Sequence, residues 1–452
     1  MDPTIDRPAS APHRNRRASL ARVGPHRHRI RVPFGGRLLH YWRGLGPGLV
    51  TGASDNDPSG ITTYSVAGAT TRYGLLWMAV FTMPLLVAVQ SMAARIGACK
   101  EEGLGEVIKA RFGRKVLIGS VVILLIANTA TIAADLGGVA AGVHLLAPIP
   151  MAVVIPTVGL ALLAVEVFWS YRRFASLIKW LTLVLFLYFV SGFVARPDWR
   201  QVVKSTFIPH LAFSSDFLGP AVAILGTTIS PYMFFWITSQ EVQEEEERAG
   251  PDLDDDPVTA PRAEHHRRVD VITGMGYANV VFYFIVLANA ATLGARGIKI
   301  RTAAQAAQAL SPIVGRFDTV IFAVGLIGAG LIAIPVLAGS AAYPLAELFG
   351  WREGLENPLH RAPGFYAALC VAILVGIALN FFGIDPVKAL VYAAVLQGFL
   401  APILLVLLTL VARDEGVMGP HSNGWYDSTF GFLAAGVMAA AAIALVVVTF
   451  AG

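Results

Sequence analysis

The 452-residue chain is 55% hydrophobic and only 14% charged, with a mean hydropathy of +0.62 and a formal net charge of +5. Soluble domains carry about 25% charged residues, so the composition excludes an ordinary soluble protein and indicates an integral membrane protein. Residues 1–44 hold ten arginines against two aspartates and no apolar run long enough for a signal peptide. We expect them to form a basic, flexible cytoplasmic tail, with contact to anionic lipid headgroups as the alternative.

Eleven segments after this tail are apolar and long enough to cross a bilayer, which takes about 20 residues per helix. Their continuous apolar runs lack the alternating pattern of a β-barrel, so the predicted fold is an all-α bundle. The predicted spans are 45–70, 74–98, 115–146, 149–169, 174–195, 216–240, 269–293, 317–345, 363–383, 386–412 and 428–450.

Two of these spans share a pattern of prolines. Pro47 opens the first span and Pro58 interrupts it, while Pro220 opens the sixth and Pro231 interrupts it; both pairs are offset by 173 residues. Proline frees backbone carbonyls from the helical ladder, and such groups persist in a membrane only where they line a cavity or find partners. Two interrupted segments at matching positions indicate the central binding site of a transporter, and ordinary proline kinks are the alternative.

The matching breaks also predict the domain organisation. A transporter core at 45–412 consists of repeat one, about 45–195, and repeat two, about 216–412, while 413–452 adds a loop and an eleventh helix. Basic residues concentrate in the even-to-odd loops, which predicts a cytoplasmic N-terminus and, with an odd number of spans, an extracytoplasmic C-terminus. Some basic residues of the odd-to-even loops break this rule, Lys204 and Arg301 among them.

Asp57 stands beside the first break, inside a membrane span. A carboxylate at that depth costs at least about 2.5–3.5 kcal/mol, so it indicates function. Together with free carbonyls it would make a hard-oxygen cation site. The residues alone therefore predict a cation-binding secondary transporter.

Two other features carry less information. Residues 241–264 contain ten acidic residues and two arginines, a composition typical of a solvated, disordered linker. This segment could instead concentrate cations at the cytoplasmic mouth. Cys99 and Cys370 form no ligand pattern and are interpreted as packing residues.

Several stretches resemble the NRAMP family of divalent metal transporters. GPGLVTGASDNDPSGITTYSVAGA resembles the family's first helix, with its D-P-G-N hallmark, and LGTTISPYMFF its sixth, with M-P-H. LLWMAVFTMPLLVAVQSMAARIGACKEEGLGEVI and ATIAADLGG are similar to its second and third helices. The resemblance covers about residues 44–413 and implies a LeuT-type fold with 5+5 inverted repeats, discontinuous helices 1 and 6, and alternating access.

The resemblance also implies a set of metal ligands, and two of them are changed. Asp57 matches the coordinating aspartate, and the two backbone-carbonyl ligands fall on Ser54 and Thr227. The motif asparagine falls on Gly60 and the coordinating methionine on Ser230. Both side-chain ligands are therefore lost.

The changed ligands shift the expected ion. A thioether favours transition metals, whereas hydroxyl, carboxylate and water suit Mg²⁺ and Mn²⁺. Mg²⁺ keeps several of its waters, so a roomier all-oxygen site with Asp57 as ligand and Asp55 nearby suits a partly hydrated ion. The pattern is similar to the NRAMP-related magnesium transporters, and we expect Mn²⁺ to share the route.

The family's proton-carrying groups are mostly missing. Its histidine falls on Tyr232, and two glutamates of the third helix fall on Asn128 and Gly138, while Asp135 matches a family aspartate. We expect weak or absent proton coupling, because two charges crossing 100 mV gain about 4.6 kcal/mol without a proton. Asp135 is interpreted as a hydrogen-bonded structural residue, with a proton relay as the alternative.

Three further residues are weaker candidates. Thr228 would bind ion-bound water or the preceding helical turn. Tyr232 would line the exit path or fill the volume of the lost histidine. Gln397 would contact the ion during occlusion or join helices.

The sequence leaves other functions open. The alternatives are a proton-coupled Mn²⁺/Fe²⁺ symporter, a Na⁺-coupled organic solute carrier on the same fold, and a membrane protein that does not transport. No nucleophile–base pair, hydrolase motif or phosphate loop indicates an enzyme, so we expect none, and no cofactor or nucleic-acid partner. The expected partners are the divalent ion and a bacterial plasma membrane, and the oligomeric state stays undetermined.

Overall fold

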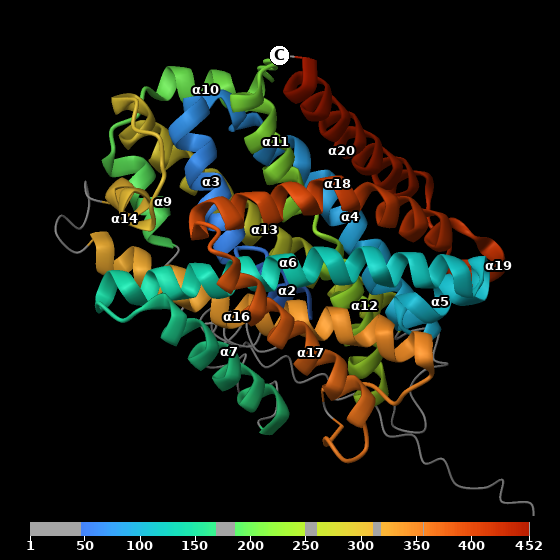
Figure 1. The fold of residues 1–452 in the computed structure, drawn as a ribbon. Helices are drawn as coiled ribbons and strands as arrows, with labels where there is room; N and C mark the ends of the chain where they lie inside the picture. Colours follow the sequence, from blue (N-terminus) through green and yellow to red (C-terminus); the bar gives the residue numbers. More distant parts are fainter. Residues whose placement is uncertain (1–46, 169–185, 249–259, 311–317, 356, 452) are drawn as a thin grey trace, which may run out of the picture. The chain divides into compact units, whose positions relative to one another are not determined.

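The computed structural model describes residues 47–168, 186–248, 260–310, 318–355 and 357–451, and every regular element in these ranges is a helix (Figure 1). The continuous long helices are α4 (Trp77–Lys100), α6 (Arg114–Leu146), α7 (Met151–Phe168), α13 (Ala260–Thr292), α16 (Asp318–Phe349), α17 (Pro363–Leu379), α18 (Pro386–Arg413) and α20 (Trp425–Ala451). The first and sixth predicted spans are each split, into α2 (Pro47–Ser54) with α3 (Pro58–Thr71) and α11 (Ser215–Thr228) with α12 (Pro231–Arg248). Shorter helices are α5 (Leu104–Phe112), α9 (Phe186–Val194), α10 (Trp199–Phe207), α14 (Ala303–Ala307) and α19 (Glu415–Met418), with 3-10 turns η1 (Arg72–Leu75), η3 (Gly294–Arg296), η4 (Gln308–Leu310), η6 (Asn380–Phe382) and η7 (Gly419–His421).

The predicted spans agree with this architecture. Within the described residues, nine helical stretches are long and apolar enough to cross a membrane, and they coincide with nine of the eleven predicted spans. The first predicted span, at 45–70, is not among these nine because it is broken between α2 and α3. Of the fifth predicted span, at 174–195, only the part in α9 lies within the described residues. The tail predicted at 1–44 lies outside them.

The sixth span begins at Ser215, in agreement with its predicted start, but Pro220 lies inside α11 and does not open it. Two other predicted boundaries are wrong. At the other end of the sixth span α12 continues to Arg248, and α13 already begins at Ala260. Much of 241–264, predicted to be a disordered linker, is therefore helical. The ion pairs of Arg267 with acidic residues of α12, described below, explain why the acidic residues there can be ordered.

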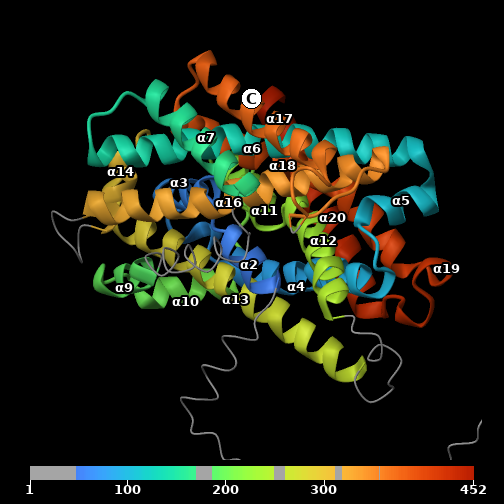
Figure 2. The same ribbon diagram turned by 90° about the horizontal axis from the view of Figure 1, so that it is seen from below.

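The long helices enclose the two breaks. The long α6 packs along α16, α11 packs along α18, and the half-helices α2 and α3 both lie against α13 (Figures 1 and 2). α12 packs between α4 and α16. The 18-residue apolar window of the sixth span is entirely buried inside the protein, as expected for a helix that faces other helices and not lipid.

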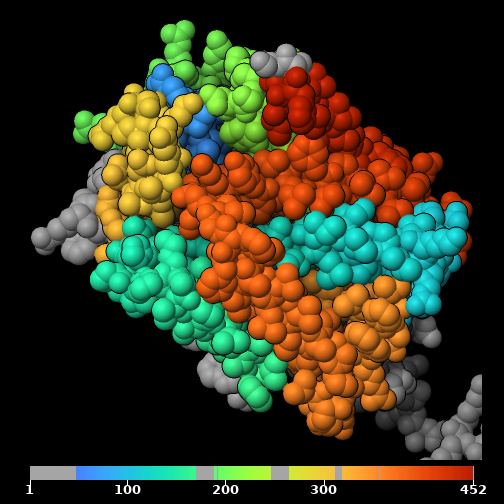
Figure 3. All heavy atoms as spheres, viewed as in Figure 1, coloured from blue at the N-terminus to red at the C-terminus, as the bar shows by residue number. Residues whose placement is uncertain are grey.

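The outer helices carry the apolar surface. Figure 3 shows a face formed largely by teal α6 and α7 and by orange-to-red α16, α17, α18 and α20. Apolar side chains on these helices are exposed, for example Val153 at 55%, Val371 at 58% and Ile443 at 64%. In a soluble protein such a surface would be a liability, whereas in a bilayer it contacts hydrocarbon.

Candidate ion-binding site at the helix breaks

Each break begins a new helix with a proline. Asp55 to Asp57 connect α2 to α3, and Ile229 with Ser230 connects α11 to α12. Pro58 and Pro231 each occupy the first position of the following half-helix, where the missing N–H costs no hydrogen bond. The two predicted breaks are confirmed, and they are true interruptions, not kinks in continuous helices.

Asp57 is the N-cap of α3. Its Oδ1 accepts hydrogen bonds from the Gly60 N–H at 2.5 Å and from the Ser59 hydroxyl at 2.8 Å. Asp57 is only 1% exposed, and its Oδ2 has no hydrogen-bond partner among the described residues. One oxygen therefore fixes the carboxylate in place, while the other is buried and available to a cation.

Oxygens from both broken helices meet around Gly60. A Cβ on this glycine would stand 3.1 Å from each of three oxygens: the Asp55 carbonyl, Asp57 Oδ1 and Thr227 Oγ1. The structure thus brings Asp55, Asp57 and Thr227 together. The atom of Thr227 that lies here is its side-chain oxygen, whereas the sequence pointed to its backbone carbonyl. The three atoms nearest to this position are all oxygens.

Both predicted carbonyl ligands accept hydrogen bonds from hydroxyl groups. The Ser230 hydroxyl donates to the carbonyls of Gly226 at 2.6 Å and Thr227 at 2.8 Å. The Tyr232 hydroxyl donates to the Ser54 carbonyl at 3.0 Å. Each carbonyl therefore keeps one lone pair at most for an ion. Ser230 and Tyr232 thus each contact one of the two carbonyls that the sequence predicts as ligands.

The first break holds a polar residue that the sequence analysis did not single out. Asn56 is fully buried, and neither its Oδ1 nor its Nδ2 has a hydrogen-bond partner in the described part of the chain. Its neighbour Asp55 is 1% exposed, with Oδ1 likewise unpartnered. Unpaired polar groups are rare in protein interiors, so they mark a place that binds water or an ion. The only signal in the sequence was the position of Asn56 between two aspartates.

Asp135, a residue of α6, contacts the helix that follows the first break. Its Oδ1 accepts a hydrogen bond from the Ser59 N–H at 3.1 Å, so it caps α3 beside Asp57. The resembled family carries glutamate at two nearby positions of α6, which are Asn128 and Gly138 in this chain. Both are packed against other helices. Asn128 bonds the Ser340 hydroxyl at 2.8 Å, and a Cβ on Gly138 would come within 2.9 Å of Pro58.

The remaining candidates lie near the breaks and bond to other helices. The Thr228 hydroxyl lies 3.4 Å from that of Tyr64 on α3. Gln397 on α18 donates from Nε2 to the Thr131 hydroxyl of α6 at 2.8 Å. Its Oε1 is buried and has no partner among the described residues. Both residues therefore join helices around the site.

The residues available for metal binding are few. In the described ranges, no group of three or more His, Cys, Asp or Glu side chains could hold a metal ion. A cation here would have to combine a carboxylate with hydroxyl and carbonyl oxygens and water, which is the ligand set of hard cations.

The comparison with known protein families settles the family. A family model described as "Natural resistance-associated macrophage protein-like", Nramp, matches residues 48–448. The chain belongs to the Nramp family. This Nramp protein is 26% identical over 412 residues to the divalent metal cation transporter MntH of Caldanaerobacter subterraneus, covering 89% of this chain and 92% of that one. It is also 26% identical to MntH of Bacillus subtilis, covering 90% and 92%.

Solved structures show the same fold. The manganese transporter of Eremococcus coleocola superposes with a TM-score of 0.71 at 21% identity, covering 93% of this Nramp protein and 89% of that chain. The nucleobase-cation symporter Mhp1 matches with a TM-score of 0.51 at 14% identity, covering 90% and 93%. The protein is an all-α integral membrane protein with a LeuT-type fold. Within the described residues, nine helical stretches can cross a membrane, and the first and sixth predicted spans are discontinuous.

Proposed function

We propose that this Nramp protein is a divalent metal cation transporter that moves Mg²⁺, and Mn²⁺ as a second substrate, into the cytoplasm by alternating access. The observation that carries the proposal is the Asp57 carboxylate, buried where two broken helices meet, with one oxygen that has no partner in the described part of the chain. A charge in that position is costly unless it binds a cation. Relatives named as divalent metal and manganese transporters support metal transport as the function.

The choice of a hard, partly hydrated ion rests on the second break. Ser230 and Tyr232 offer the ion neither sulfur nor imidazole, and their hydroxyls occupy one lone pair each on the Thr227 and Ser54 carbonyls. An ion at Asp57 therefore finds few protein ligands and retains several waters. Mg²⁺ is the cation that binds in this way, because it dehydrates reluctantly.

Weak or absent proton coupling follows from the surroundings of Asp135. That carboxylate caps α3, and neither Asn128 nor the closely packed Gly138 can carry a proton. The membrane potential supplies the driving force, about 4.6 kcal/mol for a divalent ion at 100 mV. We place the protein in a bacterial plasma membrane with the N-terminus cytoplasmic and the C-terminus extracytoplasmic.

A proton-coupled Mn²⁺/Fe²⁺ symporter is the second candidate, favoured by the manganese named for the Eremococcus coleocola structure. A Na⁺-coupled carrier of organic anions is disfavoured, because Asp55 and Asp57 would repel a substrate carboxylate. An enzymatic function is disfavoured because the relatives are named as transporters.

Flux into proteoliposomes tests the proposal, with Mg²⁺, Mn²⁺, Fe²⁺ and Ca²⁺ offered separately and internal pH recorded. We expect Mg²⁺ and Mn²⁺ uptake that follows the membrane potential without acidification. Fe²⁺ uptake with acidification and without Mg²⁺ uptake would establish the symporter instead.

Asp57→Ala should abolish uptake of every divalent ion. The matched control is Asp385→Asn, because Asp385 is also an N-cap immediately before a helix-opening proline but is exposed at the start of α18. Retained uptake in Asp57→Ala would place the ion elsewhere.

A further inference from the structure

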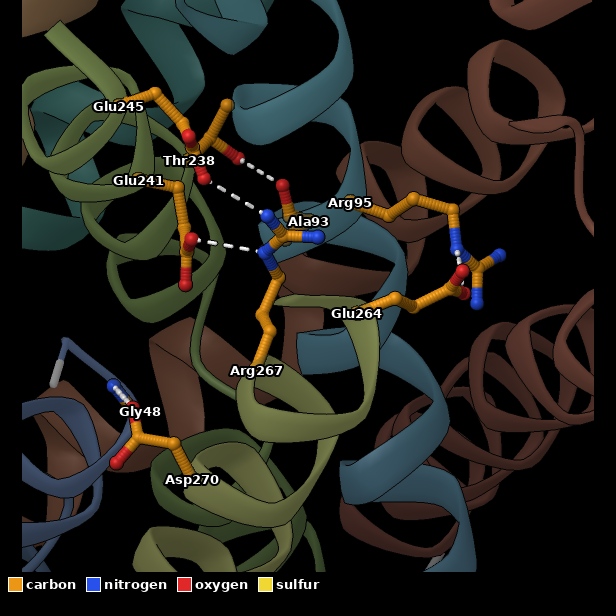
Figure 4. Close-up of polar contacts among 9 residues, drawn as sticks. All are labelled: Gly48, Ala93, Arg95, Thr238, Glu241, Glu245, Glu264, Arg267 and Asp270. Carbon is orange, nitrogen blue, oxygen red and sulfur yellow. Dashed lines mark hydrogen bonds and ion pairs between the residues drawn. The ribbon is translucent and has the colours of Figure 1, made fainter. Parts of the chain in front are cut away.

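One turn of α13 contacts the first half of one broken helix and the second half of the other. Arg267 and Asp270 are three residues apart and so lie on the same side of α13. Figure 4 shows Arg267 directed at Glu241 and Glu245 of α12, and Asp270 directed at Gly48 of α2.

The contact with α12 is a largely buried ion triad. Arg267 Nε lies 2.9 Å from Glu241 Oε2, and Arg267 Nη2 lies 2.9 Å from Glu245 Oε1. The three side chains are 12%, 3% and 17% exposed in that order. Removing one partner of such a group leaves a buried charge uncompensated, so the contact resists separation of α12 from α13.

In the contact with α2, a side chain of α13 caps the N-terminal turn of α2. Asp270 Oδ2 accepts a hydrogen bond from the Gly48 N–H at 2.7 Å. The N–H groups in the first turn of a helix have no partner within it, and a carboxylate is favourable there. α2 has only eight residues, too few to be a stable helix alone, so its position depends on such contacts.

Below this cap, the backbones of α2 and α13 touch. A Cβ on Gly274 would stand 2.0 Å from the Gly48 carbonyl oxygen, and one on Gly52 would stand 2.1 Å from that of Gly274. No side chain fits between the two helices at this point. α2 can therefore leave α13 only as a unit, by giving up the cap and the backbone contact together.

α4 completes the arrangement. The Thr238 hydroxyl of α12 donates to the Ala93 carbonyl of α4 at 3.0 Å, and Arg95 of α4 lies 3.7 Å from Glu264 of α13 (Figure 4). α4 thus contacts both α12 and α13, and α2 and α12 are both held to α13, at the end of the bundle that the charge distribution assigns to the cytoplasm.

We propose that Arg267 and Asp270 form a double latch, a pair of positioning residues that hold α2 and α12 against α13 and close the route from Asp57 to this end of the protein. Release of the ion at this end then requires that at least one of the two contacts opens. The inference rests on the proposed alternating access, but it does not depend on which ion is carried. A variant that weakens the latch shifts the population toward the state open at this end.

Thiol accessibility tests the α2 contact. Thr51→Cys places a reporter on α2 at a fully buried position, in a Cys99→Ser/Cys370→Ser background. A membrane-impermeant maleimide is applied in the absence of metal to each side of sealed vesicles. We expect Asp270→Ala to raise the modification rate about tenfold from one side only. Asp270→Asn should stay near the parent rate, because its amide oxygen still accepts from Gly48.

A second pair of variants keeps the proposal testable if Asp270→Ala does not fold. Gly274→Ala leaves Asp270 intact but forces α2 away from α13, so the Thr51→Cys reporter should react faster. Arg267→Lys keeps the charge but replaces the two nitrogens that each bond one glutamate with a single ammonium, which weakens the contact, so a Ser239→Cys reporter on α12 should react faster. Unchanged rates in monodisperse, folded Asp270→Ala or Gly274→Ala protein, together with unchanged rates in Arg267→Lys, would overturn the latch.

Transport kinetics separate a latch from a merely structural contact. Opening the latch depletes the state that binds external ion, so Asp270→Ala should raise the apparent KM by the factor by which that state is depleted. Loss of folded protein would lower the maximal flux at unchanged KM, and that result would count against the latch. Failure of metal flux in the parent protein would overturn the proposed function and leave the accessibility result intact.

Discussion

The phenol of Tyr232 on α12 donates a hydrogen bond of 3.0 Å to the backbone carbonyl of Ser54, the last residue of α2. This bond joins two half-helices, three residues before Asp57 in the chain, and occupies a carbonyl that is a ligand in the proposed ion site. In the proposed ion site, Tyr232 would therefore limit how many protein oxygens reach the ion, and so how much water the ion would give up.

Tyr232→Phe should shift selectivity toward Mn²⁺. The Ser54 carbonyl then becomes fully available to an ion, which favours the cation that dehydrates more readily. A hydrogen bond is worth about 0.5–1.5 kcal/mol net, so the ratio of Mn²⁺ to Mg²⁺ uptake should rise roughly 2- to 10-fold in a competition assay. Tyr392→Phe, at an exposed position of α18, is the control. An unchanged ratio would mean that the Ser54 carbonyl does not face the ion.

Ser230→Met should improve binding of soft metals. The change adds a thioether and releases the Thr227 carbonyl from the Ser230 hydroxyl. Cd²⁺ is a sensitive probe, and its affinity by calorimetry should rise by at least about tenfold, the equivalent of 1.4 kcal/mol. Ser230→Ala releases the carbonyl without adding sulfur and should not change Cd²⁺ affinity comparably. Equal effects of both variants would exclude sulfur coordination.

Gly60→Ala should reduce transport without a large loss of stability. The added methyl group would stand 3.1 Å from the Asp55 carbonyl, Asp57 Oδ1 and Thr227 Oγ1, so it would crowd the proposed ion site. Alanine inside a helix is favoured over glycine by about 0.5–1 kcal/mol, which offsets part of the crowding. We expect at least a fivefold lower Mg²⁺ uptake at a similar melting temperature. Uptake equal to that of the parent would show that the ion binds away from Gly60.

Asp135→Asn should transport nearly as well as the parent protein, because an amide oxygen can still accept from the Ser59 N–H. Asp135→Ala removes the cap and should cost about 0.5–2 kcal/mol of stability and lower the rate of uptake. Uptake and internal pH are measured together in proteoliposomes. A proton flux in the parent that disappears in Asp135→Asn would make this residue a proton relay instead.

Gly105→Ala should destabilise the loop helix α5. Glu347 of α16 caps this helix by accepting from the Glu106 N–H at 3.0 Å, and a Cβ on Gly105 would stand 2.2 Å from the same carboxylate oxygen. Displacing the cap should cost about 1–2 kcal/mol and lower the melting temperature in detergent. Glu347→Gln, which keeps an acceptor, should be affected less. A melting temperature equal to that of the parent would show that the cap is dispensable.

Most of the membrane architecture follows from the sequence alone. Continuous apolar runs of about 20 residues must be helices in a bilayer, because every backbone group needs a partner inside its own segment. The breaks at Pro58 and Pro231 follow for the same local reason, since proline cannot continue a helical ladder. Asp57 stood out because a carboxylate in such a span is costly.

Only the tertiary structure decided what the other polar groups do. The pairs Tyr232–Ser54 and Asp135–Ser59 join residues far apart in the chain, and no local pattern reveals them. The acidic stretch after Gln240 indicated a linker, because composition shows how many acidic residues a segment has but not which basic residues pair with them in the folded protein. Arg267 lies on another helix, and only packing brings it to Glu241 and Glu245, where it lets α12 continue. Local backbone chemistry set where the helices break, and contacts between distant segments set where they end and which oxygens remain for an ion.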